Sequence, residues 1–250
     1  MSTASIAEWY DTPLGRYVLA REQEYFDAEV TDIFGYNAIQ IGLPEVDFLR
    51  TSRIPLRLSI AAEAGADVIA SPAEIPLASQ SVDLAILPHV LEFSREPHQI
   101  LREVDRVMMP EGRVIICGFN PWSLWGLRQA LTWSRDEVPW SGSFISLTRM
   151  KDWLALLGFD VSAGRLCCYA PPFAKEPWLE RCRGFETAGD RWWGIAGGVY
   201  LLQAIKRVHG MRLILPKWEA VPVASVTRVA PMRRQPGVTS GNVVRLFGRR

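Results

Sequence analysis

The sequence predicts an α/β fold built around a mostly parallel sheet, and the stretch between residues 81 and 127 carries the prediction. Two short apolar runs, at 82–87 and 113–117, are typical of strands covered on both faces. Between them, apolar residues recur at the spacing of one helix face: Ile100, Leu101, Val104, Val107 and Met108. A strand, a helix and a second strand make one parallel crossover unit. Such sheets bind ligands at the carboxyl ends of their strands, so the two loops there are candidate functional sites.

Local signals are expected to set the ends of the crossover helix. Ser94 is a residue type that caps helices, and Pro97 falls in the first turn, where a missing N–H costs nothing. Pro110 and Gly112 are expected to stop the helix before the next strand begins.

The remaining elements are placed in chain order. Residues 5–32 are expected to form one or two helices over the site, and residues 37–87 hold the first strands. A helix capped by Ser146 ends at Gly158. Strands are then expected at 159–169 and 197–206, which gives seven strands with helices on both faces and an antiparallel last strand.

The segment 121–146 interrupts this alternation of strands and helices. It carries four tryptophans and predicts an aromatic helical insertion that serves as a cap or a substrate wall: Trp122, Trp125, Trp133 and Trp140.

Length and composition are consistent with one globular domain, expected at residues 1–218, followed by a tail at 219–250. The last 45 residues, from Lys206, hold ten Lys and Arg against the single acid Glu219. Such a basic tail binds nucleic acid or an acidic partner, or it is simply solvated; both interpretations stay open.

The sequence also excludes some classes of protein. No run of eighteen apolar residues is present, so no membrane span is expected, and the N-terminus lacks the pattern of a signal peptide. The four cysteines show no CxxC spacing, which predicts neither a metal site nor a disulfide framework, and a cytoplasmic location follows.

The crossover unit resembles the type 11 group of class I S-adenosylmethionine-dependent methyltransferases. The matching strings are Ala73-Glu74-Ile75-Pro76-Leu77, Val82-Asp83-Leu84, Val90-Leu91-Glu92-Phe93, Leu101-Arg102-Glu103 with Arg106-Val107, and Pro110-Glu111-Gly112-Arg113-Val114-Ile115. They keep the family's order over about half the chain. The resemblance implies the Rossmann-like methyltransferase fold and S-adenosylmethionine as cofactor.

The resemblance is weakest in the family's glycine-rich first motif. Of its three glycines only Gly42 remains, Gln40 replaces the acid that precedes them, and Pro44 and Val46 replace the other two glycines. The acid that grips the ribose after the second strand is missing at Ala61-Ala62, and Ser71 replaces the acid that faces adenine. Two hypotheses follow: the cofactor still binds through backbone groups and substituted side chains, or the chain is an inactive binding or scaffold protein that has lost the cofactor.

By residue-to-residue matching, the resemblance implies a cofactor site at Gln40, Gly42, Ser71, Leu87 and Pro88. His89 follows the fourth strand, where the family places residues that face the methyl group. With an ordinary pKa near neutrality, it is a candidate general base. The competing interpretation is a histidine hydrogen-bonded within its own loop.

The string GFNPWSLWGLR marks a candidate substrate site. Asn120 can orient an amide or hydroxyl, and Trp122 and Trp125 can stack on a planar or apolar substrate, or else pack the inserted helix on the sheet. The predicted function is methyl transfer to a small or medium-sized substrate. The sequence identifies neither the methyl acceptor nor the oligomeric state.

Overall fold

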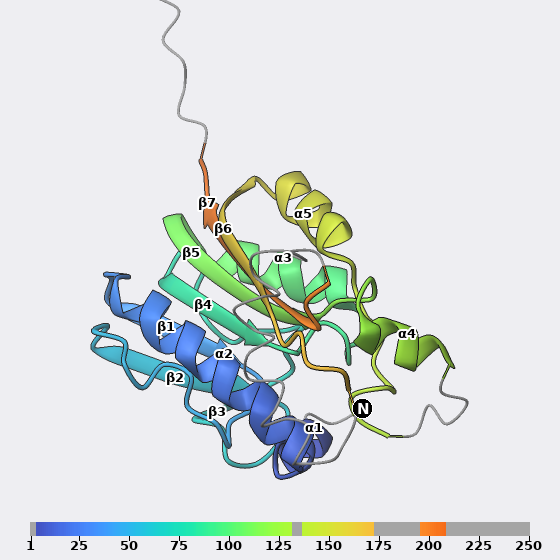
Figure 1. Ribbon diagram of the computed structural model, residues 1–250. Coiled ribbons are helices and arrows are strands. Elements are labelled where there is room, and N and C mark those ends of the chain that lie inside the picture. Colours follow the sequence, from blue (N-terminus) through green and yellow to red (C-terminus); the bar gives the residue numbers. More distant parts are fainter. Residues whose placement is uncertain (1–3, 132–136, 173–195, 209–250) are drawn as a thin grey trace, which may run out of the picture. The chain divides into compact units, whose positions relative to one another are not determined.

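The computed structural model describes residues 4–131, 137–172 and 196–208 (Figure 1). Its sheet has seven strands in the order β3-β2-β1-β4-β5-β7-β6. In chain order the strands are β1 (Asn37–Ile41), β2 (Leu56–Ala61), β3 (Val68–Ile69), β4 (Val82–Pro88), β5 (Met108–Phe119), β6 (Phe159–Cys167) and β7 (Val199–Lys206). β7 runs antiparallel to both of its neighbours, and the pairs among β1 to β5 are parallel. The predicted seven-stranded, mostly parallel sheet is confirmed.

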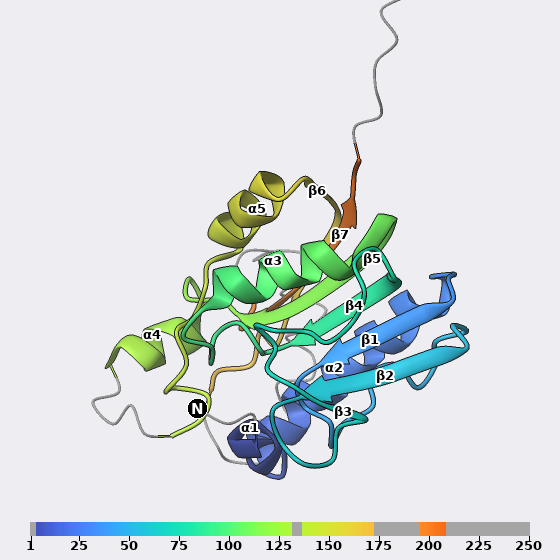
Figure 2. The same cartoon turned by 180° about the vertical axis from the view of Figure 1, so that it is seen from behind.

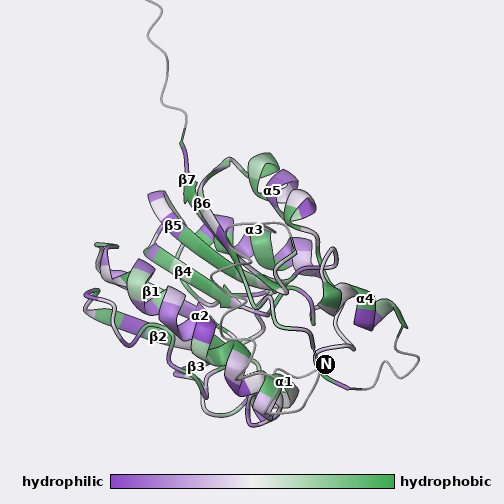
Figure 3. Cartoon of the chain, viewed as in Figure 1, coloured by the Kyte–Doolittle hydropathy of each residue, from purple (hydrophilic) through white to green (hydrophobic). Residues whose placement is uncertain are grey.

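Helices cover both faces of this sheet. They are α1 (Ala4–Tyr10), α2 (Pro13–Thr31), α3 (Pro97–Val107), α4 (Leu124–Leu131) and α5 (Leu147–Leu156). α2 lies across one face, and α3 and α5 lie on the other, as the two opposite views show (Figures 1 and 2). Side chains of β4 alternate between the two layers: Leu84 and Ile86 pack with the α1–α2 cluster, whereas Ala85 and Leu87 pack with the α3–α5 cluster. Accordingly, β4 and β5 are hydrophobic along most of their length (Figure 3).

The predicted helical region at 5–32 is confirmed as two helices with a sharp corner between them. Thr12 begins α2, since its hydroxyl accepts a hydrogen bond from the Gly15 N–H at 3.1 Å. Gly15 is required by close approach, because a Cβ there would lie 2.0 Å from the carbonyl oxygen of Trp9.

The ends of α3 differ in detail from the prediction. Pro97 is in the first turn as expected, but Ser94 is not the cap: the residue before the helix is Glu96, which makes no side-chain capping bond. The Ser94 hydroxyl instead accepts from the Glu96 N–H at 3.0 Å, in the turn that leads to the helix. α3 ends at Val107 and β5 begins directly, so Pro110 lies inside the strand region and not at the helix end.

The predicted insertion at 121–146 is helical only at α4 within the residues that the structure describes, and Trp133 lies outside them. Trp125 and Trp140 are buried and join the core against Trp9, Phe119 and Phe144. The segment is therefore partly a packing element of the α1–α2 layer.

The predicted tail at 219–250 lies outside the described residues, so its contact with nucleic acid stays a prediction. Among the described helices, none is both long and apolar enough to cross a bilayer.

Candidate functional site

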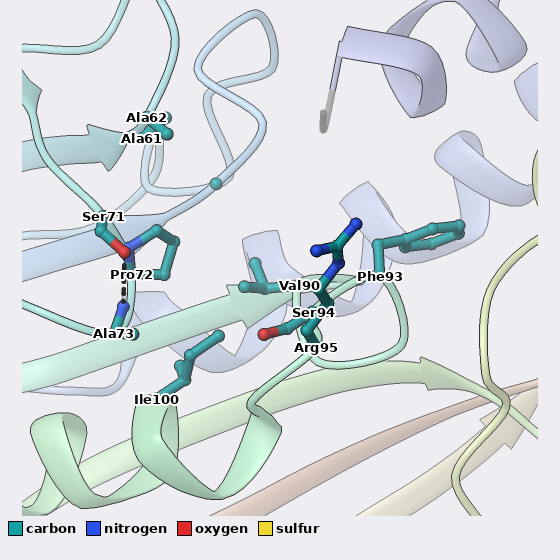
Figure 4. A pocket seen from close by; sticks show the side chains of 11 residues that line it. Ala61, Ala62, Ser71, Pro72, Ala73, Val90, Phe93, Ser94, Arg95 and Ile100 are labelled. Atoms are coloured by element: carbon teal, nitrogen blue, oxygen red, sulfur yellow. Dashed lines mark hydrogen bonds between the residues drawn. The ribbon is translucent and has the colours of Figure 1, made fainter. Parts of the chain in front are cut away.

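A pocket of about 210 Å³ opens where the carboxyl ends of β1, β2, β3 and β4 meet (Figure 4). β1 and β4 are neighbours although β2 and β3 come between them in sequence, so the strand order reverses here, which is where α/β sheets bind ligands. The lining is dominated by small and apolar side chains: Gly42, Ala61, Ala62, Ser71, Pro72, Ala73, Val90, Phe93, Ser94, Arg95 and Ile100.

The first wall is the turn after β1. Gly42 and Leu43 both have positive φ, 81° and 48°, so the chain reverses within two residues. The side-chain amide of Gln40 holds this turn together. Its NH₂ group donates to the carbonyl oxygens of Gly42, Leu43 and Val46 at 3.2, 2.8 and 2.7 Å, and its oxygen accepts from the Phe48 N–H at 3.0 Å. A carboxylate at this position could not donate to three carbonyls.

The second wall is the loop from Ser71 to Ser79, which α3 holds in place. The Glu103 carboxylate accepts from the Ile75 N–H at 3.1 Å, and the Arg106 guanidinium donates to the carbonyl oxygens of Ile75 and Leu77 at 2.7 and 2.9 Å. Glu103 and Arg106 also pair with each other at 2.8 Å. The pair lies in the family-like string of α3, and its structural role is to brace the pocket wall that carries Ser71.

The third wall is the loop after β4, whose residues serve two sites. Val90, Phe93 and Arg95 line the pocket, whereas His89 and Glu92 point into the core beneath α1 and α2. His89 has a φ of 52°, a conformation that residues other than glycine adopt uncommonly. Its backbone N–H donates to the Cys117 carbonyl oxygen at 3.1 Å. The backbone is thus held so that adjacent side chains face opposite ways.

His89 sits in a buried charged cluster with Glu22, Glu92, Cys117 and Tyr10. Its Nε2 lies 2.7 Å from Glu22 Oε1 and 3.3 Å from Cys117 Sγ, and its Nδ1 lies 2.9 Å from Glu92 Oε1. The Tyr10 hydroxyl donates to Glu22 Oε2 at 2.7 Å. The His89 and Glu22 side chains are fully buried, and that of Glu92 is 1% exposed.

Both ring nitrogens of His89 face carboxylate oxygens, so the ring donates from both sides when it is protonated. Burial by itself lowers the pKa of His89, but the carboxyl groups of Glu22 and Glu92 raise it, and the pKa lies well above its ordinary value. Burial raises the pKa of the Cys117 thiol well above the usual range, with Glu22 acting in the same direction. The His89 side chain has no exposed surface in this conformation, an arrangement that gives a general base no path to substrate.

The predicted substrate residues are spread over different environments. Asn120 is buried, and its amide links the end of β5 to the segment before β7 by donating to the Gly197 carbonyl at 3.0 Å. Trp125 is 1% exposed, and its indole N–H donates to the Ala170 carbonyl at 3.0 Å. Trp122 is 78% exposed and precedes α4, so the two tryptophans do not share a face. Of the three, only Trp122 is accessible to a substrate.

Of the predicted cofactor residues, Gly42 and Ser71 line the pocket and three others do not. The Gln40 side chain is hydrogen-bonded within its own turn and borders a separate cavity. Leu87 and Pro88 are buried in β4. Sequence reasoning missed Val90, Phe93 and Arg95. The signal available was their position in the loop after β4, which directly follows a strand of the parallel sheet.

Comparison with known proteins defines the family. The methyltransferase-domain model named Methyltransf_11 matches residues 51–116. An uncharacterized Escherichia coli protein, YafS, is 31% identical over 172 residues, which covers 68% of this chain and 69% of that protein. The chain belongs to the type 11 group of class I S-adenosylmethionine-dependent methyltransferases. An uncharacterized Mycobacterium bovis protein is 28% identical over 216 residues, 82% of this chain and 73% of its own length.

Solved structures show the same fold for this type 11 chain. A Thermotoga maritima protein described as a S-adenosylmethionine-dependent methyltransferase and possible histamine N-methyltransferase has a TM-score of 0.53 at 13% identity, covering 77% of this chain and 97% of its own. A chain from a complex between a Haloferax volcanii methyltransferase activator and a methyltransferase has a TM-score of 0.55 at 13% identity, covering 84% and 99%. The [4+2]-cyclase SpnF has a TM-score of 0.53 at 14% identity, covering 76% and 81%. The fold alone therefore does not fix the reaction.

The cofactor of this family is S-adenosylmethionine, and the pocket fits it in position and lining. Gly42, Ala61, Ala62 and Ala73 leave open space that larger side chains would fill, and Ser71 supplies a hydroxyl. No aspartate or glutamate lines the pocket among the described residues. Backbone groups, the Ser71 hydroxyl and apolar side chains are what the described lining offers a ligand.

Proposed function

We propose that this protein transfers the methyl group of S-adenosylmethionine to a small or medium-sized acceptor that enters beside the loop at residues 90–95. The observation that carries the proposal is the convergence of four parallel strand ends on one pocket lined by small side chains. When bound, the cofactor supplies a methyl group activated by a positively charged sulfur. The rest of the catalytic effect is proximity and alignment, which a pocket at the strand ends can provide.

The lining restricts the kind of acceptor. Among the described residues, the pocket wall carries no histidine, aspartate or glutamate, and His89 is buried behind it. The proposed acceptor atom is therefore one that is nucleophilic without help from a base on this described wall. Arg95 is the charged side chain on the wall and favours a carboxylate or another anionic group on the acceptor or the cofactor. In this proposal His89 holds the loop in place and does not take a proton.

Calorimetric titration with S-adenosylmethionine and S-adenosylhomocysteine tests the site. Ala62 lines the pocket and is exposed, so Ala62→Trp should fill the pocket without disturbing the core; Ala64→Trp, two residues on and also exposed, is the matched control. We expect binding by the native protein and the control and a loss of at least tenfold in Ala62→Trp. Equal binding by both variants would show that the cofactor binds outside this pocket.

Catalysis needs its own measurement. Purified protein is incubated with the cofactor and a panel of amines, thiols and carbon acids with and without a carboxylate, and release of S-adenosylhomocysteine is followed. Turnover that Ala62→Trp abolishes supports the enzyme. Cofactor binding without turnover on any acceptor class favours a second function.

The second candidate is a methyltransferase-fold binding or scaffold protein. It is favoured by the Gln40-closed turn and by the pocket volume, about 210 Å³ against roughly 300 Å³ or more for typical ligand sites. Failure of the native protein to bind S-adenosylmethionine at millimolar concentration would decide for this function.

A further inference from the structure

Three side chains of the buried cluster bring three different ligand atoms to one point. Glu22 from α2, His89 from the end of β4 and Cys117 from β5 each offer one atom, and these atoms all lie within 4.8 Å of one another. All three residues are buried. Of these, Glu22 and Cys117 both approach the same nitrogen, His89 Nε2, at 2.7 and 3.3 Å. One N–H can point at only one of them, whereas a cation between the three atoms would satisfy all.

We propose that Glu22, His89 and Cys117 form a structural site for a divalent metal ion of the zinc type. A thiolate, an imidazole and a carboxylate are the ligand set that zinc takes in proteins, and thiolate selects against magnesium and calcium. The fourth position falls to the second oxygen of Glu22, which now accepts from Tyr10, or to the Tyr10 oxygen itself. The site is distinct from the pocket, whose lining contains none of these residues.

The groups around the three ligand residues are arranged as the outer shell of a metal site. His89 Nδ1 lies 2.9 Å from Glu92 Oε1, so its other nitrogen is turned toward Glu22 and Cys117. Glu92 is itself fixed, because the same oxygen accepts from the Phe119 N–H at 2.9 Å. A carboxylate that orients a ligand histidine from behind is the usual partner of such ligands.

Two of the three ligand distances need only a small adjustment, whereas the pair formed by the Glu22 oxygen and the Cys117 sulfur, which lies within 4.8 Å, would have to close to roughly 3.5 Å. Two ligand atoms with bonds of about 2.0 Å to a tetrahedral zinc lie roughly 3.3 Å apart, and a nitrogen–sulfur pair lies roughly 3.5 Å apart. The nitrogen–oxygen pair would therefore open by roughly half an ångström and the nitrogen–sulfur pair by less. The ion would connect α2 to the ends of β4 and β5 and so hold the loop that forms the pocket wall.

Because the site is buried, the ion must be supplied during folding. The full chain is unfolded in denaturant with a chelator and a reductant, refolded with Co²⁺ or Zn²⁺, desalted, and analysed for bound metal and for thiolate-to-cobalt charge-transfer absorption. Cys117→Ser removes the ligand sulfur with minimal change of shape. Cys167→Ser removes a buried thiol of the same core cluster that is outside the site.

We expect one ion per chain, with the charge-transfer band, in the native protein and in Cys167→Ser, and at least a tenfold weaker affinity with no band in Cys117→Ser. The native protein with metal should also unfold at a higher temperature than the chelated protein. If the native protein refolds but retains no ion, the metal site is wrong, and the cluster is held by hydrogen bonds alone. An ion retained equally by Cys117→Ser would show adventitious binding elsewhere. Neither result depends on methyl transfer, so the proposed function is tested separately.

Discussion

The pocket and the buried cluster share the loop after β4 but differ in solvent exposure and in the charge of their side chains. The pocket, on the α3 side, is open and lined by small uncharged residues apart from Arg95, whereas the cluster, beneath α1 and α2, concentrates two carboxylates, an imidazole and a thiol away from solvent. The titratable groups that sequence reasoning would assign to catalysis are thus in the core. In this chain, therefore, ionisable side chains support the site from the core, and the described pocket wall offers small side chains, backbone groups and Arg95.

The largest expected effect on stability comes from removing the histidine of the buried cluster. His89→Leu leaves two buried carboxylates without their cation, and breaking such a buried pair costs about 3–5 kcal/mol. Urea denaturation measures the change in the free energy of unfolding. His98→Leu, on the exposed surface of α3, should cost no more than about 0.5 kcal/mol. A small effect of His89→Leu would show that the two carboxyl groups do not depend on His89 for their burial.

Next in size is the contrast between the two tryptophans of one string. Trp125→Ala removes a fully packed indole and its hydrogen bond to Ala170, at a cost of about 3 kcal/mol or more. Trp122→Ala removes a side chain that is 78% exposed and should change the free energy of unfolding by less than about 0.5 kcal/mol. Thermal and urea unfolding of the two variants provide the comparison. Similar losses in both would place Trp122 in a packed interface.

Restoring the family's acid in the first motif should harm this chain. Gln40→Glu turns a group that donates to three carbonyl oxygens into one that repels them, and it should cost about 1–3 kcal/mol. Gln80→Glu, at an exposed turn, is the control. The measurement is urea denaturation at neutral pH. A neutral or stabilising Gln40→Glu would show that the turn can open to the arrangement found in the family.

The fold was predictable from sequence to a larger extent than the site. Apolar runs such as 82–87 and the helical spacing from Ile100 to Val107 depend on local periodicity, so strands, helices and the parallel sheet follow from the sequence. The roles of Gln40 and His89 depend on partners outside their own segments or on the closure of a turn. Glu22 is 67 residues from His89 in the chain, and no local pattern signals that contact.

The same distinction explains the substrate residues. Trp122 and Trp125 are three residues apart, which predicts a shared face only if both lie in one helix. α4 begins at Leu124, after Trp122, and the side chain of Asn120 closes the turn that leads into Trp122 by accepting from the Trp122 N–H at 3.0 Å. A two-residue difference in where the helix begins was enough to separate two residues that the sequence grouped together.

A smaller effect is expected from adding charge to the pocket. Ala62 follows β2, where the family has its ribose-binding acid, and it is exposed to the pocket. Ala62→Asp should raise the affinity for S-adenosylmethionine about tenfold, because a hydrogen bond to a charged acceptor is worth about 1.5 kcal/mol or more. Ala62→Asn separates charge from shape, and Ala64→Asp separates a local contact from a general electrostatic effect. Equal gains in Ala62→Asp and Ala64→Asp would rule out direct contact with the ribose.

The smallest effect concerns the brace between α3 and the pocket wall. The hydrogen bonds from Arg106 lower the pKa of Glu103 below its ordinary value, against an opposing effect of burial and with help from the Ile75 N–H. A carboxyl whose pKa is lowered by folding stabilises the native state above its unfolded pKa and loses that contribution as the pH falls through the folded value. Stability should therefore decline on acidification below about pH 4.5, by about 1 kcal/mol from this group. Glu103→Gln should flatten that part of the profile of unfolding free energy against pH, whereas Glu96→Gln, at an exposed site, should leave it unchanged. If cofactor affinity falls over the same pH range in the native protein but not in Glu103→Gln, then the brace controls the pocket wall as well as the stability of the fold.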